Sequence, residues 1–166
     1  MSLFEDRRYR WRETCFVLFD ARKRPKLNAV TKLLSALSSR YELTNLSEDE
    51  DGLIDLLTLI SPDDYAALDI CYSGEPEVLE QGAELVQDLK KAGADLPSSA
   101  TWEQIKRFDG RFDVLHFEQI PDDLEEDLDD DGMLDPSALL LVLNTLAKLT
   151  DGVAIDPQAG TFLVEE

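Results

Sequence analysis

The sequence lacks the residue combinations by which most enzyme families are recognised. Its 166 residues contain one histidine and two cysteines, and they include no GxGxxG, P-loop, HExxH or CxxC motif. The familiar nucleotide-binding and zinc-peptidase signatures are therefore absent. We expect no catalytic residue and no cofactor, and no motif in the chain indicates a specific function.

Positive charge is scarce and unevenly placed. The chain has 16 Lys and Arg against 36 Asp and Glu, which gives a net charge of -20. Residues 1–26 hold eight of the basic residues against four acidic ones, so the rest of the chain carries a net charge of -24. Nucleic-acid phosphates and anionic membranes both attract basic surfaces. We therefore expect neither nucleic acid nor a membrane as a partner.

The basic N-terminal segment has two interpretations. Arg8-Tyr9-Arg10-Trp11-Arg12 interleaves basic and aromatic residues, a composition that suits the binding of single-stranded nucleic acid. Because the rest of the chain has the opposite charge, we expect these arginines to dock on acidic loops of the same molecule. A small recognition patch for a partner is the alternative.

Long apolar runs are also missing. The longest, Ala138–Leu143, is far shorter than the roughly 20 residues of a membrane-spanning helix. The first residues, Met1–Asp6, lack the apolar stretch of a signal peptide. Cys15 and Cys71 each lie inside an apolar, strand-like run, which indicates two buried free thiols rather than a disulfide, zinc or redox pair. A cytoplasmic protein is the expectation that follows.

Hydrophobic periodicity predicts an α+β fold. Thr14–Asp20 carries apolar side chains on both faces, which is typical of an interior strand covered on both sides. Further strands are expected at residues 41–46, 53–60, 65–72 and 112–120, and as a closing hairpin at residues 152–155 and 161–164. We expect a single mixed, mainly antiparallel sheet with about three main helices packed on it, in a ferredoxin-like arrangement.

Three amphipathic helices are predicted from apolar residues at helical spacing. The expected buried positions are Val30, Leu33, Leu34 and Leu37 in the first, Leu79, Ala83, Val86 and Leu89 in the second, and Leu139, Val142, Leu143, Leu146 and Leu149 in the third. Leu140 and Leu141 widen the apolar surface of the third helix, so we expect it to be buried on more than one side. A short helix is expected after the capping sequence Thr101–Gln104.

Residues 1–166 are expected to form a single domain, which their number allows. The order strand, helix, strand, strand occurs within residues 14–92 and again within residues 111–166. Any two amphipathic helices match each other at several apolar positions. The sequence therefore leaves open whether the two halves are a true repeat.

One acidic segment partly matches a calcium-binding loop. The matching positions are Asp127, Asp129, Asp131, Gly132 and Asp135. The twelfth position, where such a loop has its bidentate carboxylate, is Ala138. Loss of that ligand removes the main anchor of the ion. We therefore expect a solvated acidic loop that ends in a helix cap, and no specific metal site.

Two further groups of residues could carry chemistry. His116 lies on a predicted strand beside Glu118, but no recognisable Ser or Cys nucleophile stands near it, and we expect a structural histidine. Carboxylates on strands could converge into a metal-assisted hydrolytic site, although nothing in their spacing requires it. They are Asp20, Asp55, Asp69, Asp113 and Glu118.

The closing helix and hairpin carry one resemblance. Leu146–Leu163, with the turn Asp156-Pro157-Gln158-Ala159-Gly160, resembles the last elements of uncharacterised bacterial α+β domains and of immunity-type proteins. The resemblance implies a bacterial, non-catalytic cytoplasmic protein. It transfers no catalytic residue.

Three classes of function stay open. The first is a non-catalytic binding or regulatory module that acts through a protein partner or self-association, which the absence of motifs favours. The second is an acidic inhibitor, immunity protein or nucleic-acid mimic that blocks a basic partner, which the net charge favours. The third is a metal-assisted hydrolase that uses the strand carboxylates.

Overall fold

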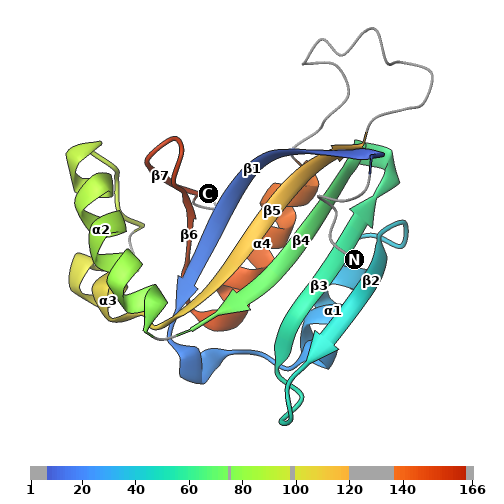
Figure 1. Cartoon of the computed structure of the whole chain (residues 1–166), viewed down its shortest axis with the longest axis horizontal. Helices are drawn as coiled ribbons and strands as arrows, with labels where there is room; N and C mark the ends of the chain where they lie inside the picture. The colour runs from blue at the N-terminus through green and yellow to red at the C-terminus, as the bar shows by residue number, and fades with distance from the viewer. Residues whose placement is uncertain (1–6, 75, 98–99, 120–136, 164–166) are drawn as a thin grey trace, which may run out of the picture.

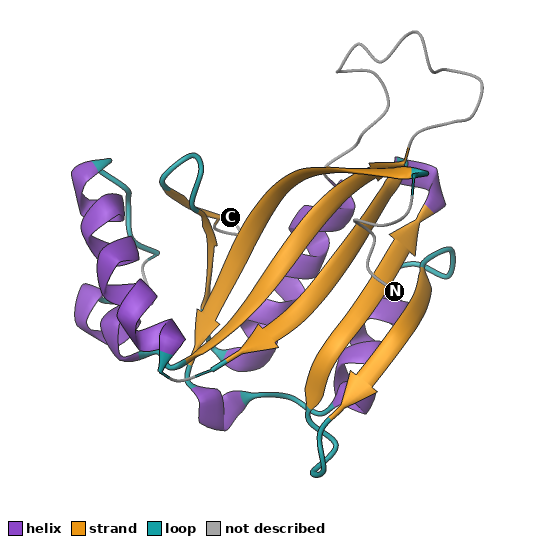
Figure 2. Ribbon diagram, in the orientation of Figure 1, coloured by secondary structure: helices purple, strands orange, loops and turns teal. Residues whose placement is uncertain are grey.

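Seven strands form one antiparallel sheet with helices on both faces (Figure 1, Figure 2). The computed structural model describes residues 7–74, 76–97, 100–119 and 137–163. The strands are β1 (Tyr9–Phe19), β2 (Glu42–Glu48), β3 (Ile54–Ser61), β4 (Ala66–Ser73), β5 (Gly110–Gln119), β6 (Val153–Asp156) and β7 (Thr161–Leu163). The helices are α1 (Leu27–Leu37), α2 (Glu77–Lys91), α3 (Trp102–Arg107) and α4 (Ser137–Thr150), with 3-10 turns η2 (Ala21–Lys23) and η3 (Pro62–Asp64).

The strand order across the sheet is β2-β3-β4-β5-β1-β6-β7. The α+β class, the single sheet and the three longer helices confirm the prediction from sequence. Each neighbouring pair of described strands is antiparallel, so the sheet is not mixed. The connection through α1 joins β1 to β2, and the connection through α4 joins β5 to β6. At least one other strand lies between the two strands of each pair, so these parallel strands are not neighbours in the sheet. Seven strands in this order also extend beyond the β-α-β-β-α-β unit of a ferredoxin-like domain.

The strand β1 is interior, as its two apolar faces predict. It pairs with β5 along most of its length and with β6 near its end. Val17 and Phe19 point into the core beneath α1 and α4, whereas Leu18 points to the opposite side, where α2 and α3 pack. Alternate residues of one strand therefore serve two separate cores.

The two halves of the chain share an element order but build the sheet differently. Both α1 and α4 pack on the same face. In the first half the second strand of the hairpin, β3, is the inner one, whereas in the second half the first strand, β6, is the inner one. A repeat relationship between residues 14–92 and 111–166 stays a prediction.

The faces of all three longer helices differ from those predicted. On α1 the buried positions are Leu27, Val30 and Leu34, whereas Leu33, predicted to be buried, is 40% exposed. On α2 the buried positions are Val78, Gly82, Val86 and Leu89, so the contact face is rotated towards Val78 and away from Ala83, which is exposed. The spacing of apolar residues did not indicate this face, because Gly82 has no apolar side chain and yet lies on the packed side of the helix. On α4, Leu140 and Leu141 are 47% and 44% exposed, so this helix is buried on one side.

The basic N-terminal segment contacts acidic residues of the same molecule. Arg24 stacks on Tyr72 at 3.9 Å and pairs with Asp49 and Asp55. Lys23 pairs with Asp151 at 3.1 Å. These contacts lie at the turn that leads from β1 into α1. Of the arginines in Arg8–Arg12, Arg10 and Arg12 pair with Glu118 of the neighbouring strand β5 rather than with an acidic loop.

Two further expectations concern a calcium-binding loop and a membrane-spanning helix. The calcium-loop candidate at residues 127, 129, 131 and 135 lies outside the described residues. None of the helices within the described part of the chain is long and apolar enough to cross a membrane.

Candidate functional site

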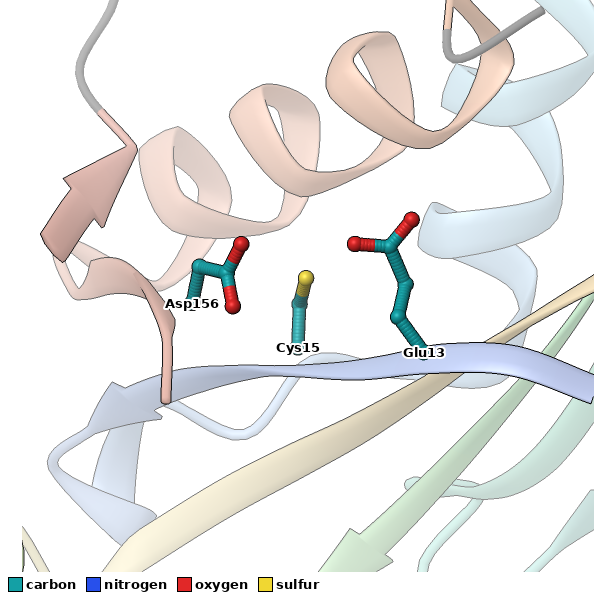
Figure 3. Close-up of side chains that lie close together, drawn as sticks. All are labelled: Glu13, Cys15 and Asp156. Carbon is teal, nitrogen blue, oxygen red and sulfur yellow. The ribbon is translucent and has the colours of Figure 1, made fainter. Parts of the chain in front are cut away.

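A group of ionisable side chains lies under α4, where β5 and β6 pair with the two sides of β1. Glu13 of β1 is opposite His116 of β5, and Cys15 is opposite Val114. Residues two apart on a strand face the same side, so Glu13 and Cys15 both point towards α4. Asp156, the last residue of β6, turns its carboxylate to the same place (Figure 3).

The Glu13, Cys15 and Asp156 side chains form a compact cluster, which we call the β1–β6 cluster. One carboxylate oxygen of each acid and the Cys15 Sγ all lie within 4.8 Å of one another. Figure 3 shows the sulfur between the two carboxylates. Glu13 and Asp156 are partly exposed, whereas Cys15 is 1% exposed. The cluster thus joins two partly exposed carboxylates to a buried thiol.

The Cys15 thiol is strongly protonated in this environment. Burial, followed by the negative charges of Asp156 and Glu13, raises its pKa to about 12. The thiolate is the nucleophilic form of cysteine, and it is negligible at neutral pH with such a pKa. The free, buried thiol agrees with the prediction from sequence for Cys15, while Cys71 is only partly buried.

His116 is fully buried next to this cluster. Its Nδ1 lies 3.2 Å from Glu13 Oε2. Burial, which outweighs the attraction of Glu13, lowers the pKa of the imidazole. In the neutral ring Nδ1 must carry the proton to donate to the carboxylate, so Nε2 is a bare acceptor. That Nε2 is buried and has no hydrogen-bond partner among the residues that the structure describes.

A buried ion-pair group lies one step further along the same face. Glu118 accepts from Arg10 Nη2 at 2.7 Å and from Arg12 Nη1 at 3.2 Å. The β1–β5 register shifts between Trp11 and Glu13, and this irregularity brings both arginines towards one carboxylate. Within the described part of the chain, the buried Arg10 Nε has no hydrogen-bond partner. Glu118 therefore serves as a structural anchor for the start of β1.

The strand carboxylates proposed for a hydrolytic site do not converge among the described residues. Glu118 points towards α1 and α4, whereas Asp69 and Asp113 point to the opposite face, as the β4–β5 register requires. Asp69 accepts from the Thr58 hydroxyl at 2.6 Å, and Asp113 accepts from Arg111 at 2.6 Å. Asp20 pairs with Arg22 and Asp55 with Arg24, both near strand ends. The five carboxylates thus have separate partners.

A second feature is a cleft of about 150 Å³ between α2 and the sheet. Its floor comes from Phe16, Leu18 and Arg111, and its wall comes from Gln81, Gly82, Glu84, Leu85 and Asp88. Arg111 lies 4.6 Å above the Phe16 ring and is held by Asp113 and Gln81. The floor is therefore largely apolar, with its one cation already neutralised.

The exposed side of α2 adds an acidic ridge along this cleft. Glu77, Glu80, Glu84 and Asp88 are all exposed and recur at intervals of three and four residues. This spacing places them on one face of the helix. Glu84 and Asp88 belong both to the ridge and to the cleft wall. The cleft thus combines an apolar floor with negative charge on one side.

Two of the larger hollows lack such a bias. One of about 740 Å³ lies between η2 and α3 and is lined by both signs of charge, including Arg22, Lys23, Arg107, Asp20 and Asp109. Another of about 440 Å³ lies beside the C-terminal half of α4. Neither hollow is lined by side chains whose charge or polarity would favour one class of ligand.

Sequence reasoning found neither the β1–β6 cluster nor the cleft. Glu13 and Asp156 lie at opposite ends of the chain, and only the pairing of β1 with β6 brings them together. The acidic ridge is visible as regularly spaced acids between residues 77 and 88, but its position over Phe16 is a tertiary feature.

No protein-family model, no curated protein and no solved structure matches this chain. The resemblance of Leu146–Leu163 to immunity-type proteins therefore stays a prediction.

Proposed function

We propose that this protein is a non-catalytic interaction module that holds a basic segment of a partner protein in the cleft between α2 and the sheet. The observation that carries the proposal is the acidic ridge of α2 beside an apolar floor. Glu84 and Asp88 line the cleft together with Phe16 and Leu85. A lysine or arginine side chain has matching chemistry, because its aliphatic stem packs on apolar groups while its charged end meets carboxylates.

The size of the cleft fits this role. A volume of about 150 Å³ accommodates one long side chain rather than a cofactor. The net charge of -20 attracts a basic partner over distances beyond direct contact. It also disfavours nucleic acid and anionic membranes. A protein with a basic segment is therefore the partner class that fits best.

The state of the reactive groups supports a non-catalytic role. The pKa of Cys15 is raised to about 12, and burial together with Asp69 and Asp113 raises that of Cys71 to about 11. His116 is fully buried. The two free thiols face opposite sides of the sheet, since their partners on β5 are consecutive residues. Unpaired thiols also support the expected reducing, cytoplasmic compartment.

An acidic inhibitor that covers the basic site of another protein is the second candidate. The net charge favours it as much as it favours the first. The two differ in where the partner contacts the surface. An inhibitor of this kind uses distributed negative charge, whereas the interaction module depends on the cleft.

The proposal is tested by titrating the isotope-labelled protein with a hexalysine peptide and following backbone amide resonances. We expect saturable shifts centred on residues 81–88 and Phe16. The double variant Glu84→Gln/Asp88→Asn should weaken binding roughly fivefold, since each exposed charge contributes at most about 1 kcal/mol.

The matched control is Glu50→Gln/Asp51→Asn, which removes the same charge from the exposed turn between β2 and β3. It should retain wild-type affinity for hexalysine at moderate salt. Equal weakening by the two double variants would show that only net charge matters. That result would reject the cleft and support the inhibitor.

A further inference from the structure

We propose that Glu13, Cys15 and Asp156 form a Zn²⁺ site that links β1 to β6. This site is on the α4 side of the sheet, opposite the cleft, and is independent of the proposed function. One carboxylate oxygen of each acid and the thiol sulfur lie within 4.8 Å of one another (Figure 3). Zinc is bound in proteins by these three ligand types.

The geometry requires only a small adjustment. Tetrahedral zinc with bonds of about 2.0–2.3 Å places its ligand atoms roughly 3.3–3.8 Å apart. Because the three ligand atoms lie within 4.8 Å of one another, the set has to contract by at most about 1–1.5 Å. Glu13 is partly exposed and has a long, flexible side chain, so it can supply this movement. Cys15 and Asp156 are held by the pairing of β1 with β6 around Phe16 and Ile155.

The free lone pairs of both acids are available for a metal. Asp156 Oδ1 accepts from the backbone N–H groups of Gln158 and Ala159, which leaves Oδ2 unused. Glu13 Oε2 is bonded to His116, which leaves Oε1. A histidine that orients a ligating carboxylate is a common supporting contact at metal sites.

The cluster needs a cation that the described residues do not supply. Two carboxylates converge on a thiol, yet within the described structure neither Glu13 nor Asp156 pairs with a lysine or arginine. Cys15 is 1% exposed, and its thiol points between the two acids without a hydrogen-bond partner among the described residues (Figure 3). An unpartnered buried thiol aimed at two carboxylates is the second observation that indicates a ligand.

The thiol selects zinc over harder cations. Calcium and magnesium prefer oxygen ligands alone, whereas zinc accepts sulfur and oxygen together. When zinc binds, the Cys15 S–H bond breaks, a Zn–S bond forms, and the proton passes to the buffer. No oxidation takes place. Three protein ligands leave one coordination position for water or another small ligand.

The experiment uses the full chain, freed of metal by a chelator and kept reduced. Titration with ZnCl₂ followed by calorimetry should show one-to-one binding with release of protons. Titration with CoCl₂ should give the thiolate-to-cobalt charge-transfer absorption that reports a sulfur ligand. An excess of CaCl₂ or MgCl₂ should leave both signals unchanged.

Variants assign the site. Cys15→Ser should abolish the thiolate-to-cobalt charge-transfer absorption. The control variant Cys71→Ser, which removes the other cysteine, should retain it. Asp156→Asn, at a partly exposed position that folding tolerates, should weaken zinc binding at least roughly tenfold. Circular dichroism confirms that each variant is folded. Absence of the cobalt absorption in the wild type, its survival in Cys15→Ser, or unchanged zinc affinity in Asp156→Asn would each overturn the site.

Discussion

Two glycine-to-alanine substitutions should change stability in opposite directions. At Gly152, between α4 and β6, an added Cβ would lie 2.3 Å from the Leu18 carbonyl oxygen and 2.9 Å from Phe19 Cβ. At Gly82, on the buried face of α2, an added Cβ meets no atom within 4 Å. The chemical change is the same at both positions, so the comparison sets a clash with the backbone at Gly152 against the gain in helix propensity at Gly82.

The magnitudes follow from these contacts. The Leu18 carbonyl is part of the backbone at which β1 pairs with β6, so Gly152→Ala must displace the strands. Overpacking of this kind costs about 3 kcal/mol. Gly82→Ala removes the entropic penalty of a helical glycine and should stabilise by about 1 kcal/mol. For a chain of this size, 1 kcal/mol corresponds to roughly 2–4 °C in Tm.

Thermal and urea unfolding, followed by circular dichroism, measure both effects. We expect the Tm of Gly152→Ala to fall by roughly 6–12 °C and that of Gly82→Ala to rise by roughly 2–4 °C. Equal stabilities for the two variants would refute the reasoning. A Gly152→Ala protein as stable as the wild type would show that β6 does not approach β1 in the way described.

Two further predictions concern electrostatics. Asp49 accepts from the backbone N–H groups of Leu53 and Asp51, and the hydrogen bond from Leu53 is the largest cause of its lowered pKa. Its stabilising contribution is present above the unfolded pKa of about 3.9 and is lost as the pH falls through the folded value. Asp49→Asn should therefore lower Tm at pH 7, and its difference from the wild type should shrink below about pH 4. Raising NaCl from about 20 to 200 mM should raise the wild-type Tm, because salt screens the repulsion within a chain of net charge -20. A fall in Tm would show that attractive pairs such as Arg24 with Asp55 dominate.

Local patterns predicted the elements of this fold well. The strands expected at residues 53–60 and 65–72 are joined by the turn η3 at Pro62–Asp64, where proline sets the first dihedral of the turn. Thr101 caps α3 by accepting from the Gln104 N–H at 3.1 Å, as its spacing indicates. These features depend on residues close together in the sequence. Their physical causes are visible without the rest of the chain.

The candidate sites depend on register, which the sequence does not show. Strict alternation would place Arg10 on the face opposite Glu13. The irregularity between Trp11 and Glu13 reverses this, so that Arg10 reaches Glu118 on the same face as His116. A single added residue decides which side chains meet, and no local pattern marks it. The β1–β6 cluster was missed for a related reason, since its third member arrives through the pairing of β6.

Alternation along β1 also makes the two proposals separable. Glu13 and Cys15 face α4, whereas Phe16 faces α2 and forms the floor of the cleft. A substitution at Cys15 or Asp156 removes a metal ligand without altering a residue of the cleft. A substitution at Glu84 or Asp88 alters the cleft without touching the metal ligands. The zinc titrations and the hexalysine titrations can therefore succeed or fail independently, although both sites depend on the position of the same strand.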